Sequence, residues 1–214
     1  MSEERKEIEE YLDKHSLEKR LNIAINKTIK ERSEFPLYSL AHLLLQYDAK
    51  ARGIIEVSAR EVLDSRGFPT LEVTAVTPLG RFTAFASNFA AVKGEREPRY
   101  DGVSARYEGK GVAKAVNSVM EIISPALSGM DPTDQKAVDE KLKALDGTVE
   151  LSVLGVNTIN AVSMAVCKAG AAAAGVPLYK HIANLCNHSD VCLPVPVFNA
   201  LNGGTRAPSK LMFE

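Results

Sequence analysis

Four side chains toward the carboxyl end combine metal-binding chemistry with close spacing: His181, Cys186, His188 and Cys192. Imidazole and thiolate groups are ligands that zinc prefers, and four of them complete a tetrahedral site. The spacing matches no common zinc module, however, because the paired Cys-x₂₋₄-Cys motif is absent. We therefore expect surface side chains and buried thiols here, and we predict no metal site in this chain.

A second short motif, Gly109-Lys110-Gly111, is of the kind that binds phosphate through backbone N–H groups. It lacks the upstream glycine spacing and the Ser or Thr that follows the lysine in a phosphate-binding loop. We expect it to be the turn into a helix. The spacing of the sequence shows no Ser-His-Asp or Cys-His arrangement, so nucleophilic catalysis is not supported.

The composition sets limits on partners and location. The 214 residues carry 26 Lys and Arg against 27 Asp and Glu, a formal net charge of −1. A chain so nearly neutral has no global field that would favour nucleic acid or a membrane surface as a partner. Three cysteines, and no apolar segment after Met1, favour reduced thiols and a soluble, cytoplasmic protein.

The elements that must position any site begin with two helices in the first fifty residues. Apolar residues recur at helical steps over 8–29 and again over 37–44, and the break between them holds Ser33, a cap, and Pro36. Two helices cannot enclose a core, because each has a single apolar stripe. The stripe therefore packs either on the following domain or on the same hairpin of a second chain, in a four-helix bundle.

The pattern of this hairpin resembles the dimerization/docking helices of the protein kinase A regulatory-subunit type. The resemblance rests on the apolar spacing, on Pro36-Leu37 and on Ala41. It implies a homodimer or a docking partner bound through residues 8–47, and a groove for an amphipathic anchoring helix. The simpler alternative is an extension that caps its own domain. The docking face that the resemblance implies consists of Leu17, Leu21, Ile25, Leu37, Leu40 and Leu44.

Alternating and β-branched residues predict three antiparallel strands after the hairpin, at 54–63, 70–77 and 81–86. The apolar pattern then becomes helical in three segments: 112–123, a helix that starts at Asp131 or Thr133 and ends before Gly147, and 159–174. A strand meander followed by helices is an α+β arrangement in which the helices pack on the sheet.

Ordered motifs across this region resemble the amino-terminal domain of enolase. They are Ala59 to Gly67 with Pro69-Thr70, Arg106 to Val112, Leu145 to Thr148, Gly155 to Gly170, and Leu193 to Pro196 with Asn202-Gly203-Gly204. The chain is therefore identified as a member of the enolase family. The resemblance implies three parts: a helical hairpin at 1–52, the enolase amino-terminal α+β domain at 53–192, and the truncated start of the enolase barrel at 193–214.

Enolase-superfamily chemistry removes a weakly acidic proton beside a carboxylate, which needs a base and close cations that stabilise the charge on oxygen. The resemblance implies that the carboxylate metal ligands and the Lys base lie on barrel strands, beyond Glu214. The small domain of active enolases adds a mobile loop, Ser-Gly-Ala-Ser-Thr-Gly, whose Ser binds a second magnesium. The corresponding segment here is Ala86-Ser87-Asn88-Phe89-Ala90-Ala91-Val92, so Ala90 or Ala91 stands at the ligand position without a hydroxyl.

Further departures from active enolases flank this position. The loop glycines are absent, and residues 93–101 have lost the helix-like family pattern and carry Pro98. Arg206 stands where active enolases have a His that contacts substrate. Arginine still binds phosphate, so Arg206 is the candidate substrate-binding residue, but it does not titrate near neutral pH. We assign no role to Glu214.

We therefore expect a catalytically inactive enolase-like protein that acts as a structural or docking component of a larger assembly, with the ciliary axoneme as a location suggested by the resemblance. The alternative is the amino-terminal part of an active magnesium-dependent enolase, a lyase (phosphopyruvate hydratase) that converts 2-phosphoglycerate to phosphoenolpyruvate in glycolysis. In either case we expect no catalytic residue and no cofactor in this chain, and Mg²⁺ only where a complete active barrel follows.

Overall fold

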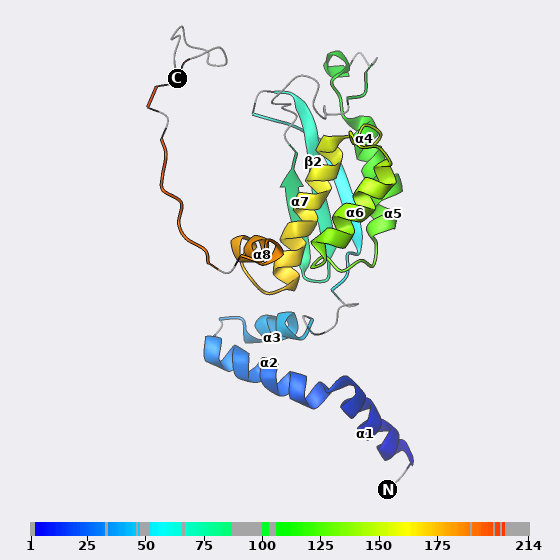
Figure 1. Ribbon diagram of the computed structural model, residues 1–214. Coiled ribbons are helices and arrows are strands. Elements are labelled where there is room, and N and C mark those ends of the chain that lie inside the picture. Colours follow the sequence, from blue (N-terminus) through cyan, green and yellow to red (C-terminus); the bar gives the residue numbers. More distant parts are fainter. Residues whose placement is uncertain are drawn as a thin grey trace.

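The computed structural model describes residues 3–32, 34–45, 47, 52–65, 67–86, 100–102, 106–188, 190–198, 200–201 and 203. Figure 1 shows a group of amino-terminal helices beside a sheet that helices cover on one face. This is the α+β arrangement that the sequence predicts.

Three helices form the amino-terminal part: α1 (Glu3–His15), α2 (Leu17–Glu31) and α3 (Pro36–Leu45). The sequence predicts one continuous helix over 8–29. That prediction is wrong because Ser16 adopts a left-handed conformation, with a φ of 50°, which L-residues do not continue as a helix. As a result α1 leads away from α2 (Figure 1), while α2 and α3 form the predicted hairpin. The predicted cap, Ser33, lies outside the described residues.

Three antiparallel strands form the sheet, in the order β1 (Glu56–Leu63), β2 (Pro69–Thr77) and β3 (Gly80–Phe85). Val57 pairs with Ala75, and Val73 pairs with Ala84. All four side chains are buried on the inward face, because alternate residues of a strand point to the same face. The predicted strands are confirmed to within two residues at each end.

The rest of the described chain is mostly helical: η1 (Arg106–Gly109), α4 (Ala113–Ser118), η2 (Val119–Ile123), α5 (Ser124–Leu127), α6 (Gln135–Asp146), α7 (Val156–Ala173) and α8 (Leu178–Leu185). In Figure 1, α7 lies along β2 and β3, and α4, η2 and α5 lie against β1. The continuous run α4–η2–α5, together with α6 and α7, corresponds to the three predicted helical segments.

Two helix starts differ from the prediction for local reasons. α6 begins after Asp134, whose carboxylate accepts a hydrogen bond from the N–H of Ala137 at 3.0 Å. Asp131, a predicted cap, instead accepts hydrogen bonds from Arg52 Nη2, at 2.6 Å, and from nearby groups. The sequence does not predict α8, because Pro177 ends the α7 pattern; a proline is also well tolerated where the next helix begins.

Small side chains let α7 approach its neighbours closely. The buried stripe of α7 is completely covered and consists of Ala161, Val162, Ala165, Val166 and Ala169. Next to it, a Cβ on Gly170 would lie 2.3 Å from the carbonyl oxygen of Pro132 and 2.9 Å from Nε2 of His181. Glycine is therefore needed at this contact.

The chain after α8 has neither helix nor strand in the described stretch 190–198, and it exposes Leu193, Val195 and Val197 almost fully. Among the described residues no single helix is long and apolar enough to cross a membrane; α7 and α8 reach that length only as a pair bent by 102°. The division at 52 and 192 into three parts stays a prediction.

Candidate functional site

The loop that is expected to approach the chemistry leaves the sheet at the end of β3. Ala90 and Ala91, the predicted replacements of the metal-binding Ser, lie outside the described residues. The described start of the loop is Ala86, which is buried. Its N–H donates to the carbonyl oxygen of Leu71 at 3.1 Å, and its carbonyl accepts from Thr70 Oγ1 at 2.5 Å. These two bonds fix the start of the loop on β2.

The other end of the loop is held at Asp101. The carboxylate of Asp101 accepts hydrogen bonds from the N–H groups of Ala113, at 2.9 Å, and Lys114, at 2.8 Å. The Lys114 ammonium donates to the Asp101 carbonyl oxygen at 2.9 Å, and the Asp101 N–H donates to the carbonyl of Gly111 at 2.8 Å. The first N–H groups of a helix have no intrahelical partner. Asp101 therefore supplies those partners and ties the end of the loop to α4.

Glu61 of β1 supports the same corner. Its Oε2 accepts a hydrogen bond from the N–H of Val112 at 2.8 Å, and its Oε1 lies 2.6 Å from Nη2 of Arg106. The Glu61 side chain is 13% exposed, whereas that of Arg106 is 58% exposed. A mostly buried carboxylate thus links β1, η1 and the start of α4. The spacing of the sequence predicts a role for neither Glu61 nor Asp101.

The structure describes His181, Cys186, His188 and Cys192, and no three of these side chains form a group that could hold a metal ion. His181 is 4% exposed, while Cys186 and Cys192 are both exposed. Burial lowers the pKa of His181 below its ordinary value, because a charged imidazole is disfavoured away from water. We interpret His181 as a neutral core residue beside Gly170.

The carboxylate of Asp146 has a lowered pKa, and its hydrogen bonds hold the turn that follows α6. Burial alone would raise its pKa. Four hydrogen-bond donors outweigh that effect and hold the pKa of Asp146 below its ordinary value: the Thr148 hydroxyl and the N–H groups of Leu154, Thr148 and Val153. Two of these hydrogen bonds, from Leu154 and Val153, measure 2.7 and 3.1 Å. A carboxylate that four donors stabilise as an anion is a structural group, not a general acid.

The described residues can be compared with the requirements of a metal site. Within the ranges that the structure describes, no three carboxylate, imidazole or thiolate groups lie close enough to hold a metal ion. Ala90 and Ala91 have no side-chain donor atom, and their place at the second-magnesium position of active enolases stays a prediction. We assign no reaction step to a metal held by this chain. Arg206 and Glu214 lie outside the described residues, and the role of Arg206 stays a prediction.

The predicted docking face points partly outward. Leu21, Ile25 and Leu37 are 40%, 41% and 80% exposed. The other three members of the face, Leu17, Leu40 and Leu44, are half-buried. The contact between α2 and α3 is made on the adjacent side, where Ala24, Thr28 and Leu43 are buried. Leu21, Ile25 and Leu37 are therefore not covered by the part of the chain that the structure describes.

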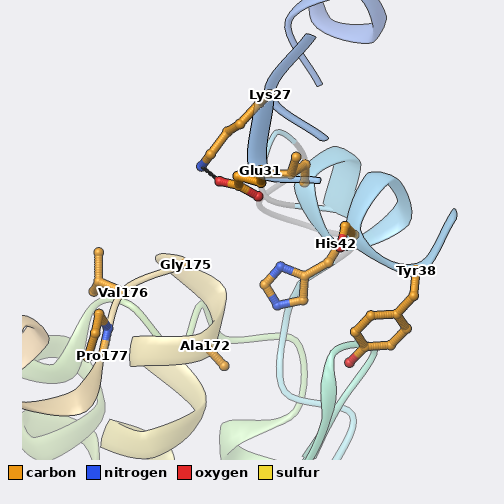
Figure 2. A pocket seen from close by; sticks show the side chains of 10 residues that line it. Lys27, Glu31, Tyr38, His42, Ala172, Gly175, Val176 and Pro177 are labelled. Carbon is orange, nitrogen blue, oxygen red and sulfur yellow. Dashed lines mark ion pairs between the residues drawn. The ribbon is translucent and has the colours of Figure 1, made fainter. Parts of the chain in front are cut away.

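A hollow of about 390 Å³ separates the hairpin from the end of α7. Figure 2 shows His42 pointing from α3 toward the turn that holds Gly175, Val176 and Pro177, and Tyr38 also lines the hollow. On the α2 side, the ammonium of Lys27 lies 3.9 Å from a carboxylate oxygen of Glu31. The hairpin thus faces its own domain with this mixed surface, and the exposed apolar face is a separate one.

Comparison with known proteins identifies similar sequences across the described fold. A family model described as "Enolase, N-terminal domain" matches residues 54–182. "Cytosolic enolase 3" of Arabidopsis thaliana is 41% identical over 213 residues, which is 97% of this chain and 43% of that protein. "Enolase B" of Dictyostelium discoideum is 47% identical over 162 residues, and "Enolase" of Eimeria tenella is 48% identical over 170 residues.

The alignments cover different shares of this chain and of its relatives. The two latter alignments each cover 75% of this chain, and 37% and 38% of the relatives. The chain therefore spans less than half the length of the relatives it matches. The Arabidopsis alignment, in contrast, omits only 3% of the 214 residues, about six, so it includes most of the amino-terminal helices.

Proposed function

Because the chain belongs to the enolase family, we propose that it forms the amino-terminal part of a magnesium-dependent enolase, a phosphopyruvate hydratase that converts 2-phosphoglycerate to phosphoenolpyruvate in glycolysis. The observation that carries this proposal is the similarity to Cytosolic enolase 3 over 97% of the chain. Since that alignment includes most of the helical extension, the extension does not set the chain apart from proteins named enolase. The name of this relative also supports the cytosol as the location.

In this proposal the chain acts as a scaffold for the loop after β3. Ala86 fixes the start of the loop on β2, and Asp101 fixes its end on α4. Both anchors belong to one sheet-and-helix body, which limits where the loop between them can reach. Proton removal belongs to groups of the barrel, and Arg206 is the residue of this chain proposed to bind the substrate phosphate.

A second candidate function is a catalytically inactive scaffold in a larger assembly, with the ciliary axoneme as its proposed location. Ala90 or Ala91 at the ligand position and Arg206 in place of a His favour it, because neither substitution keeps the original chemistry. The exposed apolar face of the hairpin also fits a structural role.

The substitutions Ala90→Ser and Ala91→Ser, made separately in a protein that carries the barrel, test the enolase proposal. We expect the parent protein to form phosphoenolpyruvate with Mg²⁺. One of the two variants should form it about tenfold faster or more, because a restored oxygen ligand helps a cation to stabilise charge in the transition state. Initial rates of phosphoenolpyruvate formation provide the measurement.

The matched control is Ser87→Ala, which removes the one hydroxyl in segment 86–92. Loss of activity in this variant would show that Ser87 already supplies the oxygen. If the folded parent and both Ser variants form no product, the enolase proposal is overturned and the scaffold is favoured.

A further inference from the structure

Two of the three cysteines lie close together in the sequence, just after α8. Cys186 is the first residue beyond the helix and Cys192 follows shortly after it, and both side chains are exposed. The third cysteine, Cys167, lies on α7 and is half-buried. Burial, and to a smaller extent the nearby Asp139, raises the pKa of the Cys167 thiol, which lowers the fraction present as the reactive thiolate. The chain therefore offers an accessible pair of thiols and a third thiol that is less reactive.

The backbone at the end of α8 holds Cys186 in place and turns the chain that follows it. The N–H of Cys186 donates to the carbonyl oxygen of Ile182 at 3.1 Å, and the N–H of His188 donates to that of Ala183 at 2.8 Å. Between them, Asn187 has a left-handed conformation with a φ of 53°, as is common where a helix ends. Cys186 is thus a fixed point from which the chain turns off the helix.

Cys192, in contrast, lies on a segment that has no buried side chains to hold it. Residues 190–192 form neither helix nor strand, and all three side chains are exposed, so bending this segment costs no buried contact. Figure 1 shows the stretch that begins here, in orange, leading away from α8 and the sheet. A disulfide needs a Cα separation of about 6 Å, whereas six extended residues span roughly 20 Å. The segment therefore bends back when the bond forms, and closing so short a loop costs little chain entropy.

We propose that Cys186 and Cys192 form a reversible disulfide, with glutathione disulfide as the oxidant. The bond closes a short loop at the end of α8 and draws the start of the exposed stretch back toward the helix. Disulfides of cytosolic proteins are mostly transient and respond to the redox state of the cell. The reduced thiols that the sequence predicts are then one of two states of this pair.

The bond forms by thiol–disulfide exchange in two steps. The thiolate of one cysteine attacks a sulfur of glutathione disulfide and releases one glutathione thiolate. The second cysteine thiolate attacks the protein sulfur of this mixed disulfide, forms the Cys186–Cys192 bond and releases the second glutathione thiolate. The two thiol protons end on the two released thiolates. The two cysteines are thus oxidised by two electrons, and one glutathione disulfide is reduced to two glutathione molecules.

The position of the bond suggests its consequence. It lies at the predicted boundary at residue 192, between the small domain and the start of the barrel. Oxidation would shorten the connection between these two parts and restrict how they are oriented. This consequence rests on the proposed function, whereas the disulfide itself requires neither a barrel nor enolase activity.

Oxidation of the full chain tests the proposal. The folded chain is incubated with glutathione disulfide, its remaining thiols are blocked with N-ethylmaleimide, and its mass is measured. We expect one free thiol, that of Cys167, and no bound glutathione. Cleavage before Asp190 then places Cys186 and Cys192 in different peptides, which should stay joined until a reductant is added. Excess reduced glutathione should restore all three thiols, and a bond that resists it would overturn the reversible state.

Serine variants assign the pairing. Cys186→Ser and Cys192→Ser each leave one exposed thiol without its partner. We expect the mixed disulfide with glutathione to accumulate about tenfold or more above its wild-type level, because in the wild type the second thiol is present at a high effective concentration and displaces glutathione. Cys167→Ser is the matched control and should form the bond at the wild-type rate. A wild-type chain that keeps glutathione bound at Cys186 and Cys192, or that pairs either of them with Cys167, contradicts the proposal.

The same thiol count in the barrel-carrying protein separates this inference from the proposed function. A protein that forms the Cys186–Cys192 bond but no phosphoenolpyruvate overturns the enolase proposal alone. A protein that forms phosphoenolpyruvate but keeps three free thiols with glutathione disulfide overturns the disulfide alone.

Discussion

Individual carboxylates hold the parts of this fold that matter most for the proposed chemistry. Glu61 and Asp101 meet at the start of α4 and give oxygen partners to three successive N–H groups, those of Val112, Ala113 and Lys114. Their contribution is to fix one end of the loop that carries Ala90 and Ala91.

Replacing Asp101 with Ala removes the acceptors for Ala113 and Lys114. We expect the free energy of unfolding to fall by about 1 kcal/mol, as for other lost helix caps, and hydrogen exchange to speed up at these two amides. The control Asp134→Ala removes the cap of α6 and should lower stability by a similar amount, with faster exchange at Ala137 instead. Unchanged exchange at Ala113 in the Asp101 variant would contradict the capping role.

Asp146 gives a pH-dependent prediction. Its pKa is lower in the folded chain than the ordinary value, so its stabilising effect is present above about pH 4 and is lost as the pH falls through the folded pKa. Asp146→Asn should therefore cost about 1–3 kcal/mol at pH 7, from lost hydrogen bonds, and less below pH 4. Urea unfolding at the two pH values measures the difference.

The control for this experiment is Asp13→Asn on α1, where the side chain is exposed. It should change the free energy of unfolding by less than about 0.5 kcal/mol. An Asp146→Asn penalty that is equally large at both pH values would show that the charge of Asp146 is not what the turn requires.

At the scale of elements, α7 is the helix on which the domain is assembled. It lies on β2 and β3, and its Gly170 is in close contact with Pro132 and His181. We expect Gly170→Ala to lower the free energy of unfolding by about 1–3 kcal/mol, because the new Cβ overlaps a backbone oxygen. The control Met164→Ala changes a 43% exposed residue of the same helix. Thermal or urea unfolding compares them, and equal stability of the two would contradict the close contact.

The elements show what could be predicted from the sequence and why. The strands follow from period-two alternation, and α6 and α7 follow from helical periodicity. The break at Ser16 was not predicted because Leu12 and Leu17 keep the apolar pattern almost continuous across it. The sequence does not single out Asp134 as the cap of α6, because Asp131 and Thr133 are equally good candidates by residue type. Only the structure shows that Asp131 is instead bound to Arg52.

Only some residues of the candidate site can be predicted from the sequence. Ala90, Ala91 and Arg206 were found because an ordered family motif marks their positions. Glu61 and Asp101 were not found, because their hydrogen-bond partners lie 51 and 12 residues away in sequence, and no local spacing links them. Contacts of this kind depend on how the sheet and α4 pack, which only the fold determines.

At the scale of the whole molecule, the hairpin of α2 and α3 lies at one end of the sheet. In Figure 1, β3 runs away from α3, so the end of β3, after which the loop begins, lies at the end of the sheet far from the hairpin.

The central claim, that this chain serves as the small domain of an enolase, is tested most directly by the rate at which the purified, barrel-carrying protein forms phosphoenolpyruvate from 2-phosphoglycerate. The proposal predicts a rate above the uncatalysed blank that is lost when Mg²⁺ is chelated and returns when it is added back. A folded protein that forms no phosphoenolpyruvate with saturating Mg²⁺ would contradict it.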